Sequence, residues 1–203
     1  MTMLRKQLRP AIAMTLVLCA ITGVIYPGAV TGLAQLIFPR QANGSLVSVN
    51  GRVVGSALIG QPFSRPEYFH PRPSAAGSGY DATASSGTNK GPTDLKLADT
   101  LIAQAVDAAV RDDGAVKGKI PADMVTASAS GLDPHISPAN AQLQLARVAR
   151  ARGIDPVALR RVLDRHTDGR QFGFLGEPRV NVLLLNIAVD SAFGAPRPLT
   201  AAK

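Results

Sequence analysis

A short segment near the middle of the chain gathers the residue types that hydrolases use. Ser128, Ser130, Asp133 and His135 lie within one loop-like stretch, and a serine, a histidine and a carboxylate can together carry out acyl transfer. The chain has no Gly-x-Ser-x-Gly elbow, and a triad is defined by geometry rather than by closeness in sequence. Because turn chemistry also explains Asp133-Pro134, a hydrolase using Asp133 and His135 is kept only as an alternative.

Metal chemistry has little support from the sequence. The three histidines, His70, His135 and His166, lie far apart, without a second histidine four residues away or a neighbouring cysteine. Cys19 is the only cysteine and lies inside an apolar run, so the rest of the chain has no thiolate ligand or nucleophile. We therefore expect no catalytic residue and no metal ligand.

One stretch of small and hydroxyl-bearing residues could bind an anion. It reads Ala84-Ser85-Ser86-Gly87-Thr88-Asn89-Lys90-Gly91. The amides of such a loop can form an anion-binding nest. The stretch lacks the Gly-x4-Gly-Lys-Ser/Thr spacing of a Walker loop, and a rigid turn explains the same composition.

The long segment from Gly60 to Pro92 shows no helical or strand period and is rich in Gly, Pro and Ser. Such segments are usually functional or disordered. Its aromatic residues, which predict an ordered loop, are Phe63, Tyr68, Phe69 and Tyr80. We expect Tyr68, Phe69, Arg72 and Ser74 to face a partner, because loops often carry function and a guanidinium pairs well with carboxylates and carbonyls.

The N-terminal part predicts a membrane anchor. No charge occurs between Arg9 and Arg40, and residues 11–38 are almost wholly apolar. As a helix this run spans about 42 Å, more than the roughly 30 Å hydrocarbon core of a bilayer. A cleaved signal peptide would have an apolar region of about 7–15 residues and a small-x-small site. We expect an uncleaved transmembrane helix, kinked after Tyr26 because Pro27 lacks a backbone donor.

Basic residues lie at both ends of this run, so the difference in charge across it favours one orientation only weakly. The positive-inside rule favours residues 1–10 in the cytoplasm and residues 39–203 outside it, which means the periplasm in a bacterium. The last residues, 192–203, are expected to form a flexible tail. The net charge is +8, but the basic residues are not interleaved with aromatic residues that could stack on bases. We therefore expect no nucleic-acid partner.

The segment after the anchor predicts an α+β domain in which helix predominates. Asn50-Gly51 between two apolar runs predicts a small antiparallel hairpin with a type I′ turn. Caps and apolar periodicity predict helices at 93–111, 138–152, 156–166 and 180–189, the last also compatible with a strand, and a short strand at 120–126.

Four stretches together closely resemble the C subunit of the Kdp potassium-transporting ATPase. They are Gly-Ser-Ala-Leu-Ile-Gly-Gln (55–61), Tyr-Phe-His-Pro-Arg-Pro-Ser-Ala (68–75), Thr-Ala-Ser through Ser-Pro (126–138) and Gly-Glu-Pro-Arg-Val-Asn-Val (176–182). Their order and spacing agree from the apolar run to about Asp190.

The resemblance implies a single-pass, non-catalytic accessory subunit of a bacterial inner-membrane complex that takes up K⁺ at the expense of ATP. Its partners would be the potassium-channel-like A subunit, the P-type ATPase B subunit and a very small F subunit. The family is described as a catalytic chaperone that raises the ATP affinity of the B subunit and helps to assemble the complex.

The resemblance also assigns ATP binding, through a loop that corresponds to Ser85, Ser86, Gly87 and Asn89, although Ser86 stands where the family has glycine. A periplasmic domain has no access to cytoplasmic ATP, so we expect no tightly bound cofactor on this chain itself. A ligand- or peptide-binding module that uses the 60–92 loop is the other alternative.

Overall fold

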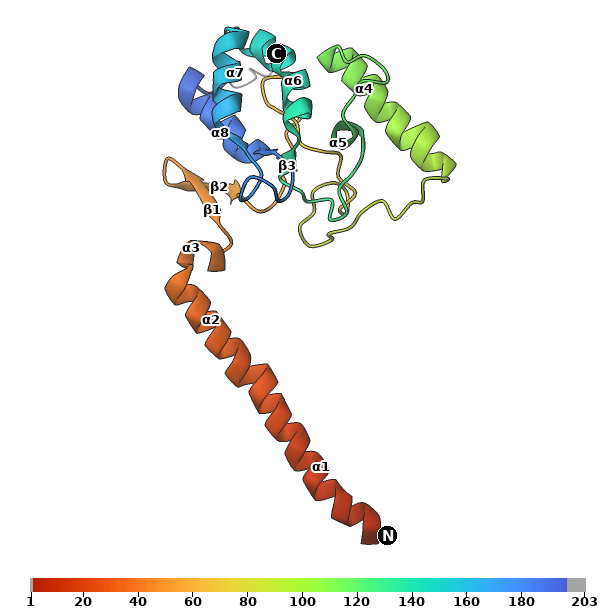
Figure 1. Ribbon diagram of the computed structural model, residues 1–203, viewed down its shortest axis with the longest axis vertical. Coiled ribbons are helices and arrows are strands. Elements are labelled where there is room, and N and C mark those ends of the chain that lie inside the picture. Colours follow the sequence, from red (N-terminus) through yellow and green to blue (C-terminus); the bar gives the residue numbers. More distant parts are fainter. Residues whose placement is uncertain (1, 197–203) are drawn as a thin grey trace, which may run out of the picture. The chain divides into compact units, whose positions relative to one another are not determined.

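The computed structural model describes residues 2–196, and the chain divides into two compact units between Leu46 and Val47. In the first unit, one continuous helix is formed by α1 (Thr2–Ala20), the π-turn η1 (Ile21–Ile25) and α2 (Tyr26–Ile37), and the single-turn α3 (Pro39–Ala42) follows (Figure 1). Within Lys6–Ile37 the mean hydropathy reaches 2.0 with no residue of that window buried. The prediction of one N-terminal apolar helix of membrane-spanning length is confirmed.

Pro27 does not end this helix. The Tyr26 amide donates to the carbonyl of Ile21, five residues back, and the chain then continues as α2. The proline ring crowds the carbonyl four residues before it, and a single π-turn is a common way for a helix to absorb such crowding. The distortion therefore lies in the turn before Pro27, where the sequence predicted a kink after Tyr26.

The second unit opens with the predicted hairpin. Strands β1 (Leu46–Val49) and β2 (Arg52–Ser56) pair with each other. Asn50 and Gly51 both have positive φ, 51° and 76°, which a type I′ turn requires at its two central residues. This prediction is confirmed.

Three helices carry the core of this unit: α6 (Pro138–Arg152), α7 (Pro156–Arg165) and α8 (Val182–Phe193). Figure 1 shows them grouped together. The caps of α6 and α7 are the predicted ones, because Ser137 accepts from the Asn140 amide and Asp155 accepts from the Val157 amide. The buried apolar cluster is built mainly from small aliphatic side chains: Ile136, Ala141, Leu145, Val148, Ala149, Leu159, Val162, Leu163, Val180, Val182, Leu185 and Val189, joined by Phe69.

A second antiparallel sheet has no counterpart among the predicted elements. Its strands are β3 (His135–Ile136), β4 (Thr167–Asp168) and β5 (Arg179–Asn181), in the order β3-β5-β4. The stretch predicted as one helix from 180 therefore begins as the central strand. Asn181 ends the strand and caps α8, because its side chain accepts from the Leu184 amide at 3.1 Å.

The remaining helices flank the long loop. Asp94 caps a helix that starts as the π-segment η2 (Lys96–Ile102) and continues as α4 (Ala103–Asp113). The strand predicted at 120–126 is wrong: the segment forms the short helix α5 (Ala122–Val125). No strand pairs with it in the described chain, and Asp123 holds it in place by accepting from the Ser137 amide and hydroxyl.

Candidate functional site

Two side-chain amides hold residues Phe69 and His70 of the long loop. Asn186 of α8 accepts from the Phe69 amide at 2.8 Å and donates to the Phe69 carbonyl at 3.0 Å. Gln144 of α6 does the same to His70, at 2.7 Å and 3.0 Å. This pairing copies the two-bond exchange between antiparallel strands. It fixes the loop against two helices and satisfies four backbone groups away from bulk water.

Arg147, one turn after Gln144 on α6, gathers further groups of the loop. Its Nη1 donates to the carbonyls of Pro66 and Tyr68 at 2.7 Å and 2.9 Å, and its Nη2 donates to Gln144 Oε1 at 2.7 Å. Its Nε donates to Asp113 Oδ1 of α4 at 2.7 Å, with the two side chains only 7% and 5% exposed. This buried ion pair joins the loop, α4 and α6 into one body.

Arg152, at the end of α6, repeats the arrangement toward α8. Its Nε donates to the Glu67 carbonyl at 2.6 Å and its Nη2 to Asp190 Oδ1 at 2.7 Å. The guanidinium carbon lies 4.9 Å from the centre of the Tyr68 ring, within the range of a cation–π contact. The Tyr68 hydroxyl donates to Asp190 Oδ2 at 3.3 Å.

The surroundings of His70 favour its neutral form. Burial, with the nearby Arg147 guanidinium, lowers the pKa of His70 below its usual value. Its Nε2 lies 3.0 Å from the Arg65 carbonyl, which can only accept, so we assign the proton to Nε2. The 3.4 Å approach of Arg147 Nη1 to the same nitrogen is therefore a contact between two donors, and a protonated ring would add a second positive charge beside Arg147.

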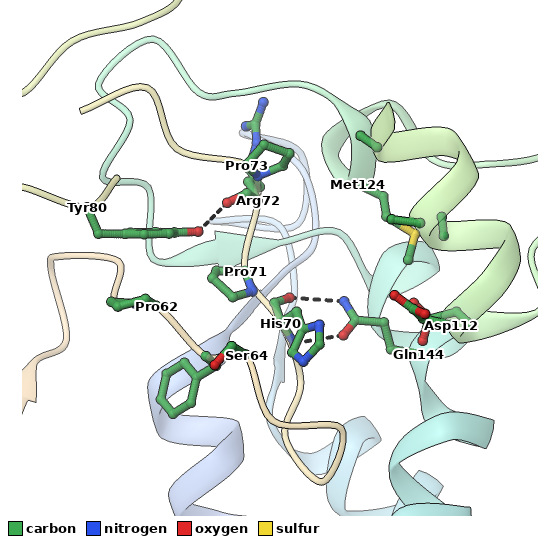
Figure 2. Close-up of a pocket in the computed structure, with 15 residues that line it drawn as sticks. Pro62, Ser64, His70, Pro71, Arg72, Pro73, Tyr80, Asp112, Met124 and Gln144 are labelled. Atoms are coloured by element: carbon green, nitrogen blue, oxygen red, sulfur yellow. Dashed lines mark hydrogen bonds between the residues drawn. The ribbon is translucent and has the colours of Figure 1, made fainter. Parts of the chain in front are cut away.

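A cavity of about 340 Å³ lies between the long loop and helices α4, α5 and α6. Figure 2 shows Tyr80 and Pro62 on one side of it, and Met124, Asp112 and Gln144 on the other. Its lining residues are Pro62, Phe63, Ser64, His70, Pro71, Arg72, Pro73, Tyr80, Ala105, Ala108, Ala109, Asp112, Asp113, Met124 and Gln144.

Most polar side chains of this cavity are already engaged within the chain. The Tyr80 hydroxyl donates to the Arg72 carbonyl, and burial raises the pKa of Tyr80. Asp112 is paired with Arg111, and Asp113 with Arg147. The cavity therefore resembles a binding hollow more than a centre for proton or acyl transfer.

The residues to which ATP binding was assigned by resemblance pack against the 128–131 loop. The Ser85 hydroxyl donates to the Ser130 carbonyl at 2.9 Å, and the Ser86 amide donates to the same carbonyl at 3.0 Å. A Cβ on Gly87 would lie 3.0 Å from the Ala129 carbonyl oxygen. Asn89 has φ of 52° and donates weakly to the Ser86 hydroxyl at 3.4 Å. Gly87 thus allows its own loop and the 128–131 loop to pack closely together.

The lysine of the same stretch is also engaged. Lys90 Nζ lies 2.8 Å from Asp94 Oδ2, four residues along the chain. Asp94 is the residue that caps the following helix, so Lys90 neutralises a cap. Contact with a phosphate would have to compete with this pair.

The residues of the hydrolase alternative are brought together only in part. His135 Nδ1 lies 3.4 Å from Asp133 Oδ1, and Arg72 Nη1 lies 3.2 Å from Asp133 Oδ2. Burial opposes the charge on Asp133, but hydrogen bonds from His135 and the Arg72 guanidinium outweigh it and lower the pKa of Asp133. The Ser128 hydroxyl lies 3.4 Å from the Ser130 hydroxyl. Asp133 is thus shared between Arg72 and His135, and no hydrogen bond between either serine hydroxyl and His135 is found among the described residues.

The four residues predicted to face a partner take part in contacts within the chain. Phe69 is fully buried, so its ring can support a partner surface only from beneath. Arg72 contacts the carbonyls of Thr126 and Ala127 in addition to Asp133. The Ser74 hydroxyl donates to the Gly131 carbonyl at 2.6 Å. Partner contact through the exposed parts of Tyr68, Arg72 and Ser74 stays a prediction.

Gln144, Arg147 and Asn186 were not singled out from the sequence as organising residues. Each is a polar residue set among apolar ones on the inner face of a helix, and each is less than 10% exposed. Buried polar side chains are nearly always hydrogen-bonded, so their placement on the apolar faces of α6 and α8 was the available signal. Each of these side chains binds the backbone of a loop far away in sequence. The residues of that loop show no pattern that predicts the contact.

The fold and these contacts define a class of protein: a small α+β domain, preceded by one helix of membrane-spanning length, whose longest loop is held rigidly by buried polar side chains. The sequence profile described as "KdpC: K+-transporting ATPase, c chain" matches residues 8–191. The chain belongs to this family, and the resemblance noted in the sequence is confirmed.

Relatives from several bacteria match over most of their length. The chain is 64% identical over 187 residues to the "Potassium-transporting ATPase KdpC subunit" of Gemmatimonas aurantiaca, covering 92% of this chain and 93% of that protein. It is 60% identical over 188 residues to the protein of the same name from Myxococcus xanthus, covering 91% and 87%. The corresponding protein of Mycobacterium tuberculosis is 53% identical over 188 residues, covering 92% and 99%.

Proposed function

We propose that this chain is a non-catalytic accessory subunit of an ATP-driven, high-affinity potassium uptake complex in a bacterial inner membrane. The observation that carries the proposal is the family match over residues 8–191, which includes both the apolar helix and the domain. The relatives are named as subunits of a potassium-transporting ATPase. The partners are the channel-like A subunit, the P-type B subunit and the small F subunit.

The contacts within the domain support a scaffolding role over an enzymatic one. Two amide clamps, through Gln144 and Asn186, and the guanidinium groups of Arg147 and Arg152 bind the loop backbone from residue 66 to residue 70. A loop held this rigidly presents a fixed surface, which lowers the conformational entropy lost on association. Asp133, the carboxylate of the hydrolase alternative, is bound by Arg72.

The orientation that we propose places the N-terminus in the cytoplasm and the domain in the periplasm. In that orientation the domain cannot contact cytoplasmic ATP. We propose that the chain raises the ATP affinity of the B subunit through contacts of its anchor or its periplasmic surface. These contacts must differ between two states of the pump. We therefore propose that Ser85 and Ser86 serve the packing of the loop and bind no ATP.

Co-expression of the full chain with the other subunits tests the proposal. The chain should co-purify with them in mild detergent, and the preparation should show K⁺-stimulated ATPase activity. Fusing a reporter that is active in only one compartment to the C-terminus tests the orientation. A chain that purifies alone under these conditions, or a C-terminus found in the cytoplasm, would contradict the corresponding part of the proposal.

A further inference from the structure

The β1–β2 hairpin has an uncharged face that points away from the core of the domain. Val49 of β1 and Val54 of β2 line a hollow of about 370 Å³ against helix α8. Because side chains alternate along a strand, Leu46 and Val53 lie on the opposite face, where they are 56% and 53% exposed. Ser48 shares this outer face and is also exposed. Two aliphatic side chains on neighbouring strands thus face outward.

The base of the hairpin is bound to the last turns of the anchor helix. Gln35 of α2 and Asn43 exchange two hydrogen bonds between their side-chain amides, of 3.1 Å and 3.3 Å. The Ser45 amide donates to the Arg40 carbonyl at 2.9 Å, so the chain after α2 folds back beside the end of the helix. Leu46 follows Asn43 by three residues and can therefore lie at most about 11 Å from it.

The length of the anchor places this base at the level of the lipid headgroups. The apolar run of residues 11–38 spans about 42 Å as a helix, and a bilayer is about 40–45 Å thick including its headgroups. Gln35 lies near the end of that run. The start of the hairpin is therefore within reach of the headgroup layer, whatever position the rest of the domain takes. Lipid surrounds a membrane-spanning helix at this level.

The charge of the segment beside the membrane complements anionic lipid. No carboxylate side chain occurs before Glu67, and both Arg40 and Arg52 are exposed. Neither arginine forms an ion pair among residues 2–196. Apolar side chains combined with unpaired basic residues are typical of segments that lie on anionic membranes. Lipid phosphates supply the missing negative charge without any further protein.

We propose that the outer face of the hairpin, with Leu46 and Val53, lies in the headgroup layer of the bilayer that the anchor spans, where Arg40 and Arg52 bind the phosphates of anionic lipids. The occupant of this face is lipid. The hairpin is then a second contact with the membrane, which restrains the tilt of the domain that a single helix would leave free. This contact requires the anchor but neither the transport complex nor the proposed orientation, so its test is independent of the proposed function.

Fluorescence quenching in vesicles tests the contact. The full chain, with Cys19→Ser, carries a single cysteine through Ser48→Cys, labelled with a small dye. A matched chain carries the label through Val116→Cys, at a position that is 61% exposed elsewhere on the domain. We expect nitroxides on the lipid headgroups to quench the label at position 48, and aqueous iodide to quench mainly the label at position 116. Equal responses of the two labels would overturn the proposal.

Two further variants of the chain labelled at position 48 test the side chains that hold the hairpin on lipid. Leu46→Thr with Val53→Thr keeps residues suited to strands but removes apolar surface, so quenching by lipid should be lost. Leu95→Thr, at a residue that is 74% exposed, is the control and should keep it. Because all three positions are exposed, the Tm of these chains should not fall. Quenching that survives the double change would overturn the proposal.

The arginines are tested by the lipid composition of the vesicles. In vesicles that contain phosphatidylglycerol, Arg52→Gln should shift the equilibrium between bound and free hairpin about fivefold toward the free form, the effect of one basic residue at an anionic surface. Arg150→Gln, at an exposed position of α6, should shift nothing. Equal effects of the two changes would contradict a contact between Arg52 and lipid phosphate.

The same measurement on the reconstituted transport complex checks the occupant. Quenching by lipid at position 48, both in the chain alone and in the complex, supports the proposal. Quenching that is lost in the complex would show that another subunit covers the face, which overturns it. A chain that joins no complex would contradict the proposed function, while its contact with lipid is still decided by the vesicles.

Discussion

Gln144 on α6 and His70 in the long loop exchange two hydrogen bonds, of 2.7 Å and 3.0 Å, so that a buried amide side chain takes the place of a neighbouring strand. Together with the same exchange between Asn186 and Phe69, it explains how a long segment without helix or strand can be ordered. The rigidity of the loop depends on the side chains of two helices, since its own backbone forms few internal hydrogen bonds.

Replacing Gln144→Ala should destabilise the chain strongly. The change removes both bonds to His70, leaves a buried amide and carbonyl without partners, and opens space beneath the loop, which together cost about 2–4 kcal/mol. Urea unfolding of the full chain in detergent measures the effect. Gln142→Ala, on the exposed side of the same helix, is the matched control and should change little. Equal stability of the two variants would show that the hydrogen bonds between Gln144 and His70 do not stabilise the fold.

Replacing Arg147→Met should be at least as damaging, because Asp113 is only 5% exposed and would lose its cation. Removal of one partner of a buried ion pair costs about 3–5 kcal/mol. Arg150→Met, at an exposed position of the same helix, is the control. The double variant Arg147→Met with Asp113→Leu should recover part of the lost stability, because it leaves no buried charge. No recovery would show that the loss comes from the loop carbonyls alone.

His70 should make the stability of the chain depend on pH. Burial and Arg147 lower the pKa of His70 below 6.5, while Asp113 and Asp112 oppose this shift. The unfolded chain therefore binds a proton where the folded chain does not. The stability from the neutral ring is complete above about pH 6.5 and is lost as the pH falls below that value toward the folded pKa.

The variant His70→Gln, which has no proton to gain, should lack this part of the pH dependence. Thermal unfolding of the full chain between about pH 5 and pH 7.5, above the range in which most carboxylates titrate, separates the two proteins. Parallel curves for variant and unaltered chain would show that His70 does not titrate as described.

The alternative of a tethered hydrolase is tested by His135→Ala. His135 contacts Asp133 at 3.4 Å, and an enzyme that uses this pair would lose its turnover. A subunit should still assemble and support potassium uptake at nearly the normal rate. Uptake measured in cells that depend on the complex distinguishes the two, and a loss of uptake with assembly intact would favour a chemical role for His135.

Local signals in the sequence predicted local structure well. Asn50-Gly51 specifies a turn because few other pairs tolerate two positive φ angles in succession. Ser137 and Asp155 specify helix starts because each places a side-chain oxygen against an unpaired amide. Each of these turns and caps involves residues within three positions of each other, so the sequence pattern alone is enough to predict it.

The parts that could not be predicted depend on distant partners. Strands β3 and β4 have two residues each, too short for an alternating pattern, and they exist because β5 pairs with both. The 120–126 segment was predicted as a strand, but no strand among residues 2–196 pairs with it, and it forms α5. Phe69 is an aromatic residue of a loop, but it is fully buried in the apolar cluster formed mainly by α6, α7 and α8. Its backbone is bound by Asn186, 117 residues away.

The central claim, that this chain acts through the transport complex without binding ATP itself, is tested most directly by the KM for ATP of the complex purified with and without it. The KM for ATP should be lower when the chain is present. It should be lowered to the same extent when Ser85→Ala and Ser86→Ala are introduced together. A KM that is indifferent to the chain, or that rises in the double variant while assembly is intact, would contradict the account.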